Sequence, residues 1–170
     1  RMGEIEASIG IEQLKKLSGI VERKQQIANM LSEGLQNING LKTPFIDHNC
    51  THSYYVYPLI IDKNKVKNKR EKIIKALEKE GVKGLMQGYA NIHLLPMYQN
   101  KIAYGKNGFP WNYEKTRKNI SYKKGICPVA EELNDETFIG IEICLFDYTD
   151  TNINEIIKAF KKIFTSLDKI

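Results

Sequence analysis

The sequence opens with Arg1-Met2-Gly3-Glu4-Ile5-Glu6-Ala7-Ser8-Ile9-Gly10, a stretch that already follows the period of an amphipathic α-helix. No Ser, Thr, Asp or Asn stands ahead of the first apolar position, where an N-cap is expected. The period continues until Asn39-Gly40, a C-terminal stop signal. We therefore predict a long connecting helix over residues 1–38, within the C-terminal part of a longer protein.

The apolar residues of this helix form one broad stripe and a few positions beside it. We expect the stripe to face the core; it consists of Met2, Ile5, Ile9, Leu17, Ile20, Ile27, Leu31 and Leu35. Ile11, Leu14 and Val21 lie off the stripe, where a helix packed on one small core is polar. Two explanations remain open: ordinary exposed apolar residues, or contact with an absent domain or a partner subunit.

Composition indicates an ordinary globular domain. The chain has 170 residues, of which 42% are hydrophobic and 27% are charged, so one domain with a real core is expected. No apolar run is long enough to span a bilayer, and no signal peptide begins the chain, so we expect no membrane association. Cys50, Cys127 and Cys144 form an odd set without CxxC spacing, which favours reduced thiols in a cytoplasmic protein.

The positive charge is concentrated in one segment. Residues 101–125 hold seven basic residues against Glu114 alone, a net charge of +6 that equals the net charge of the whole chain. Aromatic residues are interleaved with these charges. Such a segment suits an anionic ligand with a flat ring, and its candidate contacts are Lys106, Trp111, Lys123 and Lys124. The alternative is a solvated charged loop with a few packed aromatic side chains.

The pattern downstream of the first helix predicts a small α+β domain. Strands are expected over residues 52–62, 82–86 and 138–146, and helices over 68–80, over 128–133 and from Thr149 or Asp150 to Leu167. Residues 87–125 follow neither period and form a long loop or insertion, with one helical turn near residues 96–101. This order predicts a small, mainly antiparallel sheet of about three strands covered by helices on one face.

Motifs that would identify a free-standing enzyme are missing from the sequence, which contains no GxGxxG, P-loop, GxSxG or HExxH. His48-x-Cys50-x-His52 offers three metal donors but no fourth, so we expect no metal site. His93 is the best single candidate for ligand contact, because it stands in the irregular segment between Tyr89 and Tyr98. A structural histidine is the alternative.

Four groups of residues, taken in order, resemble the C-terminal part of the DegT/StrS-type aminotransferases, which are fold type I enzymes that use pyridoxal phosphate. They are Arg1-Met2-x-Glu4-x-x-Ala7-x-Ile9-Gly10-x-x-Gln13-Leu14-x-x-Leu17; His52-Ser53-Tyr54 with Tyr57-Pro58 and Asp62; His93-x-x-Pro96-x-Tyr98; and Cys127-Pro128-Val129-Ala130-Glu131. The four groups span nearly the whole chain. The resemblance depends on all of them together rather than on any single motif.

This resemblance implies that residues 1–170 form the small C-terminal domain of a homodimeric enzyme that aminates a nucleotide-linked keto sugar or a cyclitol, with an amino acid as donor. In this family the lysine that binds pyridoxal phosphate lies in the larger N-terminal domain, so the chain alone is expected to be inactive and to hold no catalytic residue. The resemblance places Arg1, Tyr89, His93 and Tyr98 near the substrate. The insertion around Gly108-Phe109-Pro110-Trp111 is longer than in many nucleotide-sugar members and leaves sugar or cyclitol open.

Two other functions are compatible with the residues alone. Residues 101–125 could bind nucleic acid, or another anionic ligand, through phosphate charge and base stacking, although nucleic acid is the less favoured partner. Alternatively, the chain could be a dimerisation domain without catalysis.

Overall fold

The computed structural model describes residues 2–105, 107–114 and 120–170, which form two compact units. The first, here called the sheet unit, comprises Arg1–Met86 and Ile139–Ile170. The second, the loop unit, comprises Gln87–Phe138. Each unit has its own set of internal contacts.

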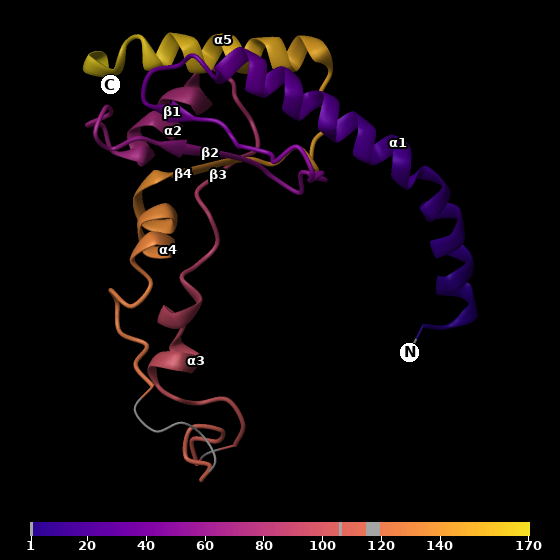
Figure 1. Ribbon diagram of the computed structural model, residues 1–170, viewed down its shortest axis with the longest axis vertical. Coiled ribbons are helices and arrows are strands. Elements are labelled where there is room, and N and C mark those ends of the chain that lie inside the picture. Colours follow the sequence, from indigo (N-terminus) through magenta and orange to yellow (C-terminus); the bar gives the residue numbers. More distant parts are fainter. Residues whose placement is uncertain (1, 106, 115–119) are drawn as a thin grey trace. The chain divides into compact units, whose positions relative to one another are not determined.

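The sheet unit begins with helix α1 (Glu4–Leu35), which has 32 residues and no side-chain cap at Gly3. Only its C-terminal third joins the core, through Ile27, Ala28, Leu31 and Leu35. The predicted core face is therefore wrong for the N-terminal half. Apolar side chains there are 50% to 77% exposed, namely Met2, Ile5, Ile9, Ile11, Leu14, Leu17 and Ile20. The cause is visible in Figure 1, where this half extends beyond the sheet that it would cover.

The sheet has four strands in the order β1-β2-β4-β3. Their bounds are β1 Leu41–Lys42, β2 Tyr57–Ile61, β3 Leu85–Met86 and β4 Phe138–Ile141. β1 pairs antiparallel with β2, and β3 pairs antiparallel with β4, which confirms the small antiparallel sheet. β1 was not predicted, since two residues are too few to show alternation.

All three predicted strands are longer than the observed ones, and β3 covers only Leu85–Met86 of the predicted 82–86. β2 starts only at Tyr57, because Tyr54 has a positive φ of 55° that interrupts the extended backbone. β4 stops at Ile141, since the backbone turns there and the N–H of Leu145 donates to the carbonyl of Glu142. Aromatic and β-branched residues around β2 and β4 therefore lie in turns rather than in longer strands.

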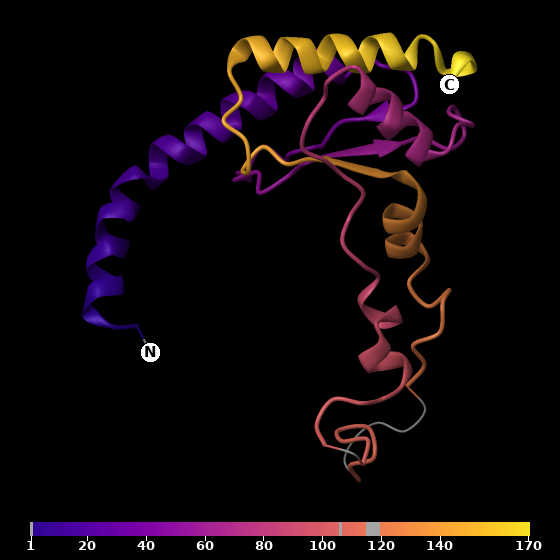
Figure 2. The ribbon, with the colours of Figure 1, turned by 180° about the vertical axis from the view of Figure 1, so that it is seen from behind.

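Helices α1, α2 (Arg70–Lys79) and α5 (Asp150–Phe164) lie on the same face of the sheet in Figures 1 and 2. The side chains of β2 agree, because Tyr57, Leu59 and Ile61 are buried while the residues between them are partly exposed. This confirms the predicted cover on one face. No helix in the described part of the chain has both the length and the apolar character that a membrane span needs.

α5 is the best-formed amphipathic element of the sheet unit. Its predicted cap is confirmed: the Thr149 hydroxyl accepts the N–H of Asn152, and the Asn152 side chain accepts the N–H of Thr149. Its core stripe is also confirmed, since Ile153, Ile156, Phe160 and Ile163 are buried. A short 3₁₀ turn, η3 (Leu167–Lys169), follows it.

α1 and α5 meet closely at Gly34. A β-carbon added at Gly34 would lie 2.5 Å from Cδ1 of Ile157, and no real β-carbon approaches another atom so closely. The absence of a side chain at this position lets the two helices cross at short distance. The crossing lies in the buried third of α1, between Leu31 and Leu35.

Within its described residues, the loop unit has only short helical elements. They are η1 Ile92–Leu94, α3 Pro96–Gln99, α4 Pro128–Glu132 and the π-helical turn η2 Leu133–Thr137. α3 confirms the predicted turn near residues 96–101, and α4 confirms a helix that starts at Pro128. The helical backbone continues past the predicted end at residue 133, because α4 is followed directly by the π-helical turn η2.

Candidate functional site

The loop unit places His93 against a buried carboxylate. Nε2 of His93 lies 2.8 Å from Oε1 of Glu131, and the two side chains are 11% and 8% exposed. η1 supplies the histidine and α4 supplies the glutamate. The pair thus joins two segments that are 38 residues apart in the sequence.

Glu131 also organises the backbone that precedes α4. Both of its carboxylate oxygens accept the N–H of Gly125 at 2.8 Å, and Oε1 accepts the N–H of Cys127 at 3.3 Å. Burial raises the pKa of Glu131, but these N–H donors and the His93 ring outweigh burial and hold that pKa below its usual value. Glu131 is therefore an anion at neutral pH.

A second carboxylate, Asp135, connects the same two segments. It accepts hydrogen bonds from Lys124 at 2.7 Å, from Asn91 at 3.0 Å and from Asn134 at 3.1 Å. The bond from Lys124 is the main cause that lowers the pKa of Asp135, and the same bond raises the pKa of Lys124. Lys124, which was predicted to contact an anionic ligand, is thus already paired with an anion.

Three aromatic rings form a cluster beside α3. Tyr98 lies 6.2 Å from Trp111 and 5.2 Å from Tyr122 between ring centroids, and Nε1 of Trp111 donates to the Tyr122 hydroxyl at 2.9 Å. Gln99 ties this cluster to the histidine segment, because its amide donates to the carbonyls of His93 and Tyr122. The structure therefore brings two predicted residues, Tyr98 and Trp111, into contact.

The other predicted residues are exposed or lie outside the described part of the chain. Tyr89 is 75% exposed, and Lys123 is exposed with its N–H bonded to the Ser121 hydroxyl. Arg1 and Lys106 lie outside the residues that the structure describes. Glu131, which the sequence analysis missed as a site residue, gives no signal of its own, since acidic residues are common in the first turn of a helix.

Two of the three candidate metal donors near position 50 have other partners. Nδ1 of His52 accepts the N–H of Tyr54 at 2.8 Å, and His48 contacts Asn49. Cys50 is an exposed free thiol. Across the described residues, no group of three or more His, Cys, Asp and Glu side chains is placed to hold a metal ion.

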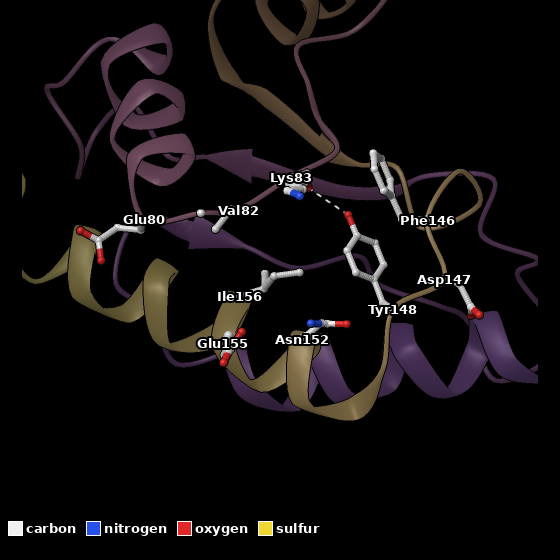
Figure 3. Close-up of a pocket in the computed structure, with 10 residues that line it drawn as sticks. Glu80, Val82, Lys83, Phe146, Asp147, Tyr148, Asn152, Glu155 and Ile156 are labelled. Carbon is white, nitrogen blue, oxygen red and sulfur yellow. Dashed lines mark hydrogen bonds between the residues drawn. The ribbon is translucent and has the colours of Figure 1, made fainter.

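A cavity of about 350 Å³ lies in the sheet unit, between the end of α2 and the start of α5 (Figure 3). The Tyr148 hydroxyl donates to the carbonyl of Lys83 at 2.9 Å along one wall. Burial, followed by the charge of Glu142, raises the pKa of Tyr148. Carboxylates dominate the charged lining, which contains Lys83 and the acidic residues Glu80, Asp147 and Glu155.

Comparison with known proteins decides the family. The sequence profile of the DegT/DnrJ/EryC1/StrS aminotransferase family matches residues 1–141. The chain belongs to this family. The long helix, the sheet, the His93–Glu131 pair and the aromatic cluster all lie within the matched residues.

Curated relatives of this DegT/DnrJ/EryC1/StrS domain come from archaea and bacteria. Uncharacterized protein MJ1066 of Methanocaldococcus jannaschii is 38% identical over 82% of this chain and 35% of its own length. Spore coat polysaccharide biosynthesis protein SpsC of Bacillus subtilis is 33% identical over 67% of this chain and 30% of its own length. The dTDP-4-amino-4,6-dideoxy-D-glucose transaminase of Escherichia coli is 23% identical over 83% of this chain and 36% of its own length. The chain spans about a third of each.

Solved structures show the same fold. The aminotransferase TlmJ from Streptoalloteichus hindustanus superposes with a TM-score of 0.67 at 24% identity, over 98% of this chain and 38% of that protein. DesV of S. venezuelae, solved in complex with a ketimine intermediate, superposes with a TM-score of 0.69 at 15% identity, over 96% of this chain and 37% of that protein. The DegT/DnrJ/EryC1/StrS fold of the chain is thereby confirmed.

The cavity of the sheet unit does not fit pyridoxal phosphate. That cofactor needs a lysine amine beside donors for an anionic phosphate. The cavity of Figure 3 does contain Lys83, but its three carboxylates would repel a phosphate group. In the loop unit, Lys124 is paired with Asp135 rather than open to a cofactor.

Proposed function

We propose that this chain is the C-terminal small domain, residues 1–170, of a pyridoxal-phosphate-dependent aminotransferase. The match of residues 1–141 to the family carries this proposal. We also propose that the Schiff-base lysine belongs to a larger preceding domain, which is supported by the length of the relatives and by the poor fit of the sheet-unit cavity to the cofactor. The names of SpsC and of the Escherichia coli transaminase support a nucleotide-linked keto sugar as substrate, with a cyclitol as the alternative.

In this proposal the larger preceding domain holds the cofactor, and the chain described here contacts the substrate. The cofactor supplies an electron sink when it is bound by the whole enzyme. The chain described here binds and orients the substrate through its loop unit. Tyr89, His93 and Tyr98 combine ring surfaces with groups that bond hydroxyls, which is the chemistry that a sugar or cyclitol ring requires. Arg1 remains a proposed substrate contact.

A nucleotide carrier would contact the basic and aromatic part of the loop unit. Trp111 offers a flat ring, and Lys123 offers an exposed ammonium group for a phosphate. Lys106 remains a proposed contact with the same anion. We assign Lys124 instead to the internal ion pair with Asp135, because a phosphate would have to displace a 2.7 Å bond to reach it.

The N-terminal half of α1 is proposed to pack on the rest of the enzyme. Its exposed apolar side chains have no cover within the sheet unit, and the relatives are about three times as long as the matched part. Gly10 and Gly19 have no neighbour within 4 Å of an added β-carbon. Since glycine weakens a helix interior, two glycines with open space beside them suit close approach by another backbone.

The remaining partners are also proposals. Glutamate or glutamine would donate the amino group, and the whole enzyme would act as a homodimer. Three free cysteines support a reducing, cytoplasmic environment.

The proposal is tested by mixing the chain with pyridoxal phosphate, reducing with borohydride and mapping any modified lysine by mass spectrometry. We expect no stoichiometric, site-specific pyridoxyl-lysine on this chain and no transamination, whereas the whole aminotransferase should be modified stoichiometrically at one lysine of its larger domain. A stoichiometric adduct within residues 1–170, or turnover by the chain alone, would contradict the division of labour.

The nucleic-acid and dimerisation alternatives predict different experimental results for the chain and for the whole protein. A gel-shift experiment at low salt with RNA and single-stranded DNA should show no retained complex, since the loop unit neutralises part of its charge internally. A whole protein that lacks any reducible lysine adduct would favour a dimerisation domain without catalysis.

A further inference from the structure

The hydrogen bonds around Glu131 determine which nitrogen of His93 carries a proton. An ionised carboxylate only accepts hydrogen bonds, and the backbone N–H groups of Gly125 and Cys127 can only donate. These bonds keep Glu131 in its ionised form. The 2.8 Å contact between Glu131 and Nε2 of His93 therefore requires a hydrogen on Nε2.

A neutral imidazole protonated on Nε2 has an acceptor lone pair on Nδ1. No hydrogen bond links Nδ1 of His93 to any other described residue, and Nδ1 is not among the buried polar atoms of the described chain that lack a partner. Nδ1 therefore reaches the surface of the loop unit. His52 shows the opposite arrangement, because its Nδ1 is occupied by the N–H of Tyr54.

We propose that Glu131 is a positioning residue that holds His93 as the Nε2–H tautomer, so that Nδ1 accepts a hydrogen bond from a hydroxyl group of the substrate ring. This inference rests on the proposed function, and it narrows the role of His93. The histidine then recognises a hydroxyl donor on the sugar or cyclitol, whereas a phosphate oxygen would need a donor on Nδ1. Recognition of any phosphate falls to other residues.

The first experiment measures the tautomer in the chain alone, without cofactor or activity. Long-range ¹H–¹⁵N spectra of chain labelled with ¹⁵N-histidine separate Nε2–H, Nδ1–H and doubly protonated rings. We expect His93 to be the Nε2–H tautomer at pH values where the ring is neutral. In Glu131→Gln the amide can donate to Nε2, so the Nδ1–H form should appear.

The matched control is Glu132→Gln, which changes the adjacent, exposed carboxylate of α4 and should leave the His93 signals unchanged. Fluorescence of Trp111, the single tryptophan of the chain, reports whether the loop unit stays folded in each variant. If Glu131→Gln unfolds the unit, the wild-type tautomer still decides the question. A wild-type His93 that is Nδ1–H, or doubly protonated throughout neutral pH, would overturn the inference.

The second experiment uses the whole aminotransferase and its sugar or cyclitol substrate. His93→Asn keeps a polar group near the position of Nδ1, and His93→Gln keeps one near Nε2. Loss of one hydrogen bond to a neutral hydroxyl corresponds to roughly a tenfold change in affinity. We expect KM to rise by about this factor in His93→Gln and by less in His93→Asn, with kcat changed little.

The outcomes separate the inference from the proposed function. Equal KM values for wild type and His93→Gln, with the expected tautomer present, would refute hydroxyl recognition while the aminotransferase proposal stands. A wild-type protein without transamination on any keto sugar or cyclitol would refute the proposed function, and the tautomer result would remain as a property of the chain.

Discussion

The sheet unit and the loop unit are each stabilised by a different kind of internal contact. The sheet unit buries apolar side chains from three helices and four strands in one core. The loop unit connects its two segments through carboxylates, chiefly Glu131 and Asp135, which bond to backbone N–H groups, His93 and Lys124. Apolar packing tolerates changes of pH, whereas carboxylate bonds depend on ionisation. The comparison therefore predicts that the units respond to different perturbations.

The largest effect is expected from the apolar core. Phe160 is fully buried on α5, so Phe160→Ala should lower the free energy of unfolding by about 3–5 kcal/mol. Urea denaturation followed by circular dichroism measures the change. Leu145→Ala is the matched control, because Leu145 is exposed in the same unit and its loss should stay within about 0.5 kcal/mol. Similar losses in both variants would contradict the assignment of the core.

Tyr57 should make the sheet unit sensitive to alkali. Burial raises the pKa of Tyr57 to about 12, although its bond to Ser32 opposes the shift. The protonated form is thus favoured in the folded state. Its contribution is fully present below about pH 10 and is lost as the pH rises toward the folded pKa, at roughly 1.4 kcal/mol per pH unit.

This prediction is checked by the free energy of unfolding between pH 9 and pH 12 in wild type and Tyr57→Phe. The variant should lack the extra slope while losing about 1 kcal/mol at neutral pH with the Ser32 bond. Tyr55→Phe changes an exposed tyrosine and should keep the slope. The same alkaline slope in wild type and Tyr57→Phe would disprove the role of Tyr57.

Gly19→Ala tests whether glycine in the exposed half of α1 lowers the stability of the isolated chain. A glycine in an exposed helix interior costs about 1 kcal/mol relative to alanine, so the variant should gain roughly that amount. Thermal unfolding of the chain measures this gain. Gly40→Ala is the opposing control, because its φ of +85° is unfavourable for alanine. If α1 packs on the rest of the enzyme at Gly19, the same alanine should reduce activity of the whole protein.

The smallest global effect is expected from acid, and it should be confined to the loop unit. The pKa values of Glu131 and Asp135 are held below their usual values, so their contribution is present above the ordinary carboxyl range and is lost as the pH falls through the lowered values. Trp111 fluorescence should change at a higher pH than the circular dichroism of the sheet unit. Coincident acid transitions of both signals would remove the distinction between the units.

The elements that were predicted well are those whose signals are local. Thr149 caps α5 and Pro128 starts α4, because capping and first-turn preferences depend on nearby backbone groups. The face of α5 follows from helical periodicity in the same way. The two-residue strand β1 was not predicted, since its pairing with β2 is a long-range property.

The site was only partly predictable for a related reason. His93 was a candidate because of its irregular surroundings, Tyr98 because of the family resemblance, and Trp111 because of the basic and aromatic composition of its segment. Their contacts depend on how two distant segments pair, which no periodicity describes. The exposed half of α1 was misassigned because an apolar stripe indicates that a face is covered but does not identify what covers it.

The close packing of Gly34 against α5 fixes the direction in which the rest of α1 extends. The helix is held on the sheet unit from Arg23, which bonds to the Tyr148 carbonyl and to Asp150, as far as the contact of Gly34 with Ile157. About 19 residues, or roughly 28 Å of helix at the usual rise, lie ahead of Arg23, so each degree of tilt would move the Glu4 end by roughly 0.5 Å. A methyl group added at Gly34 would therefore displace the N-terminal end of α1 more than any other part of the helix, and it would misalign the contacts made by that end.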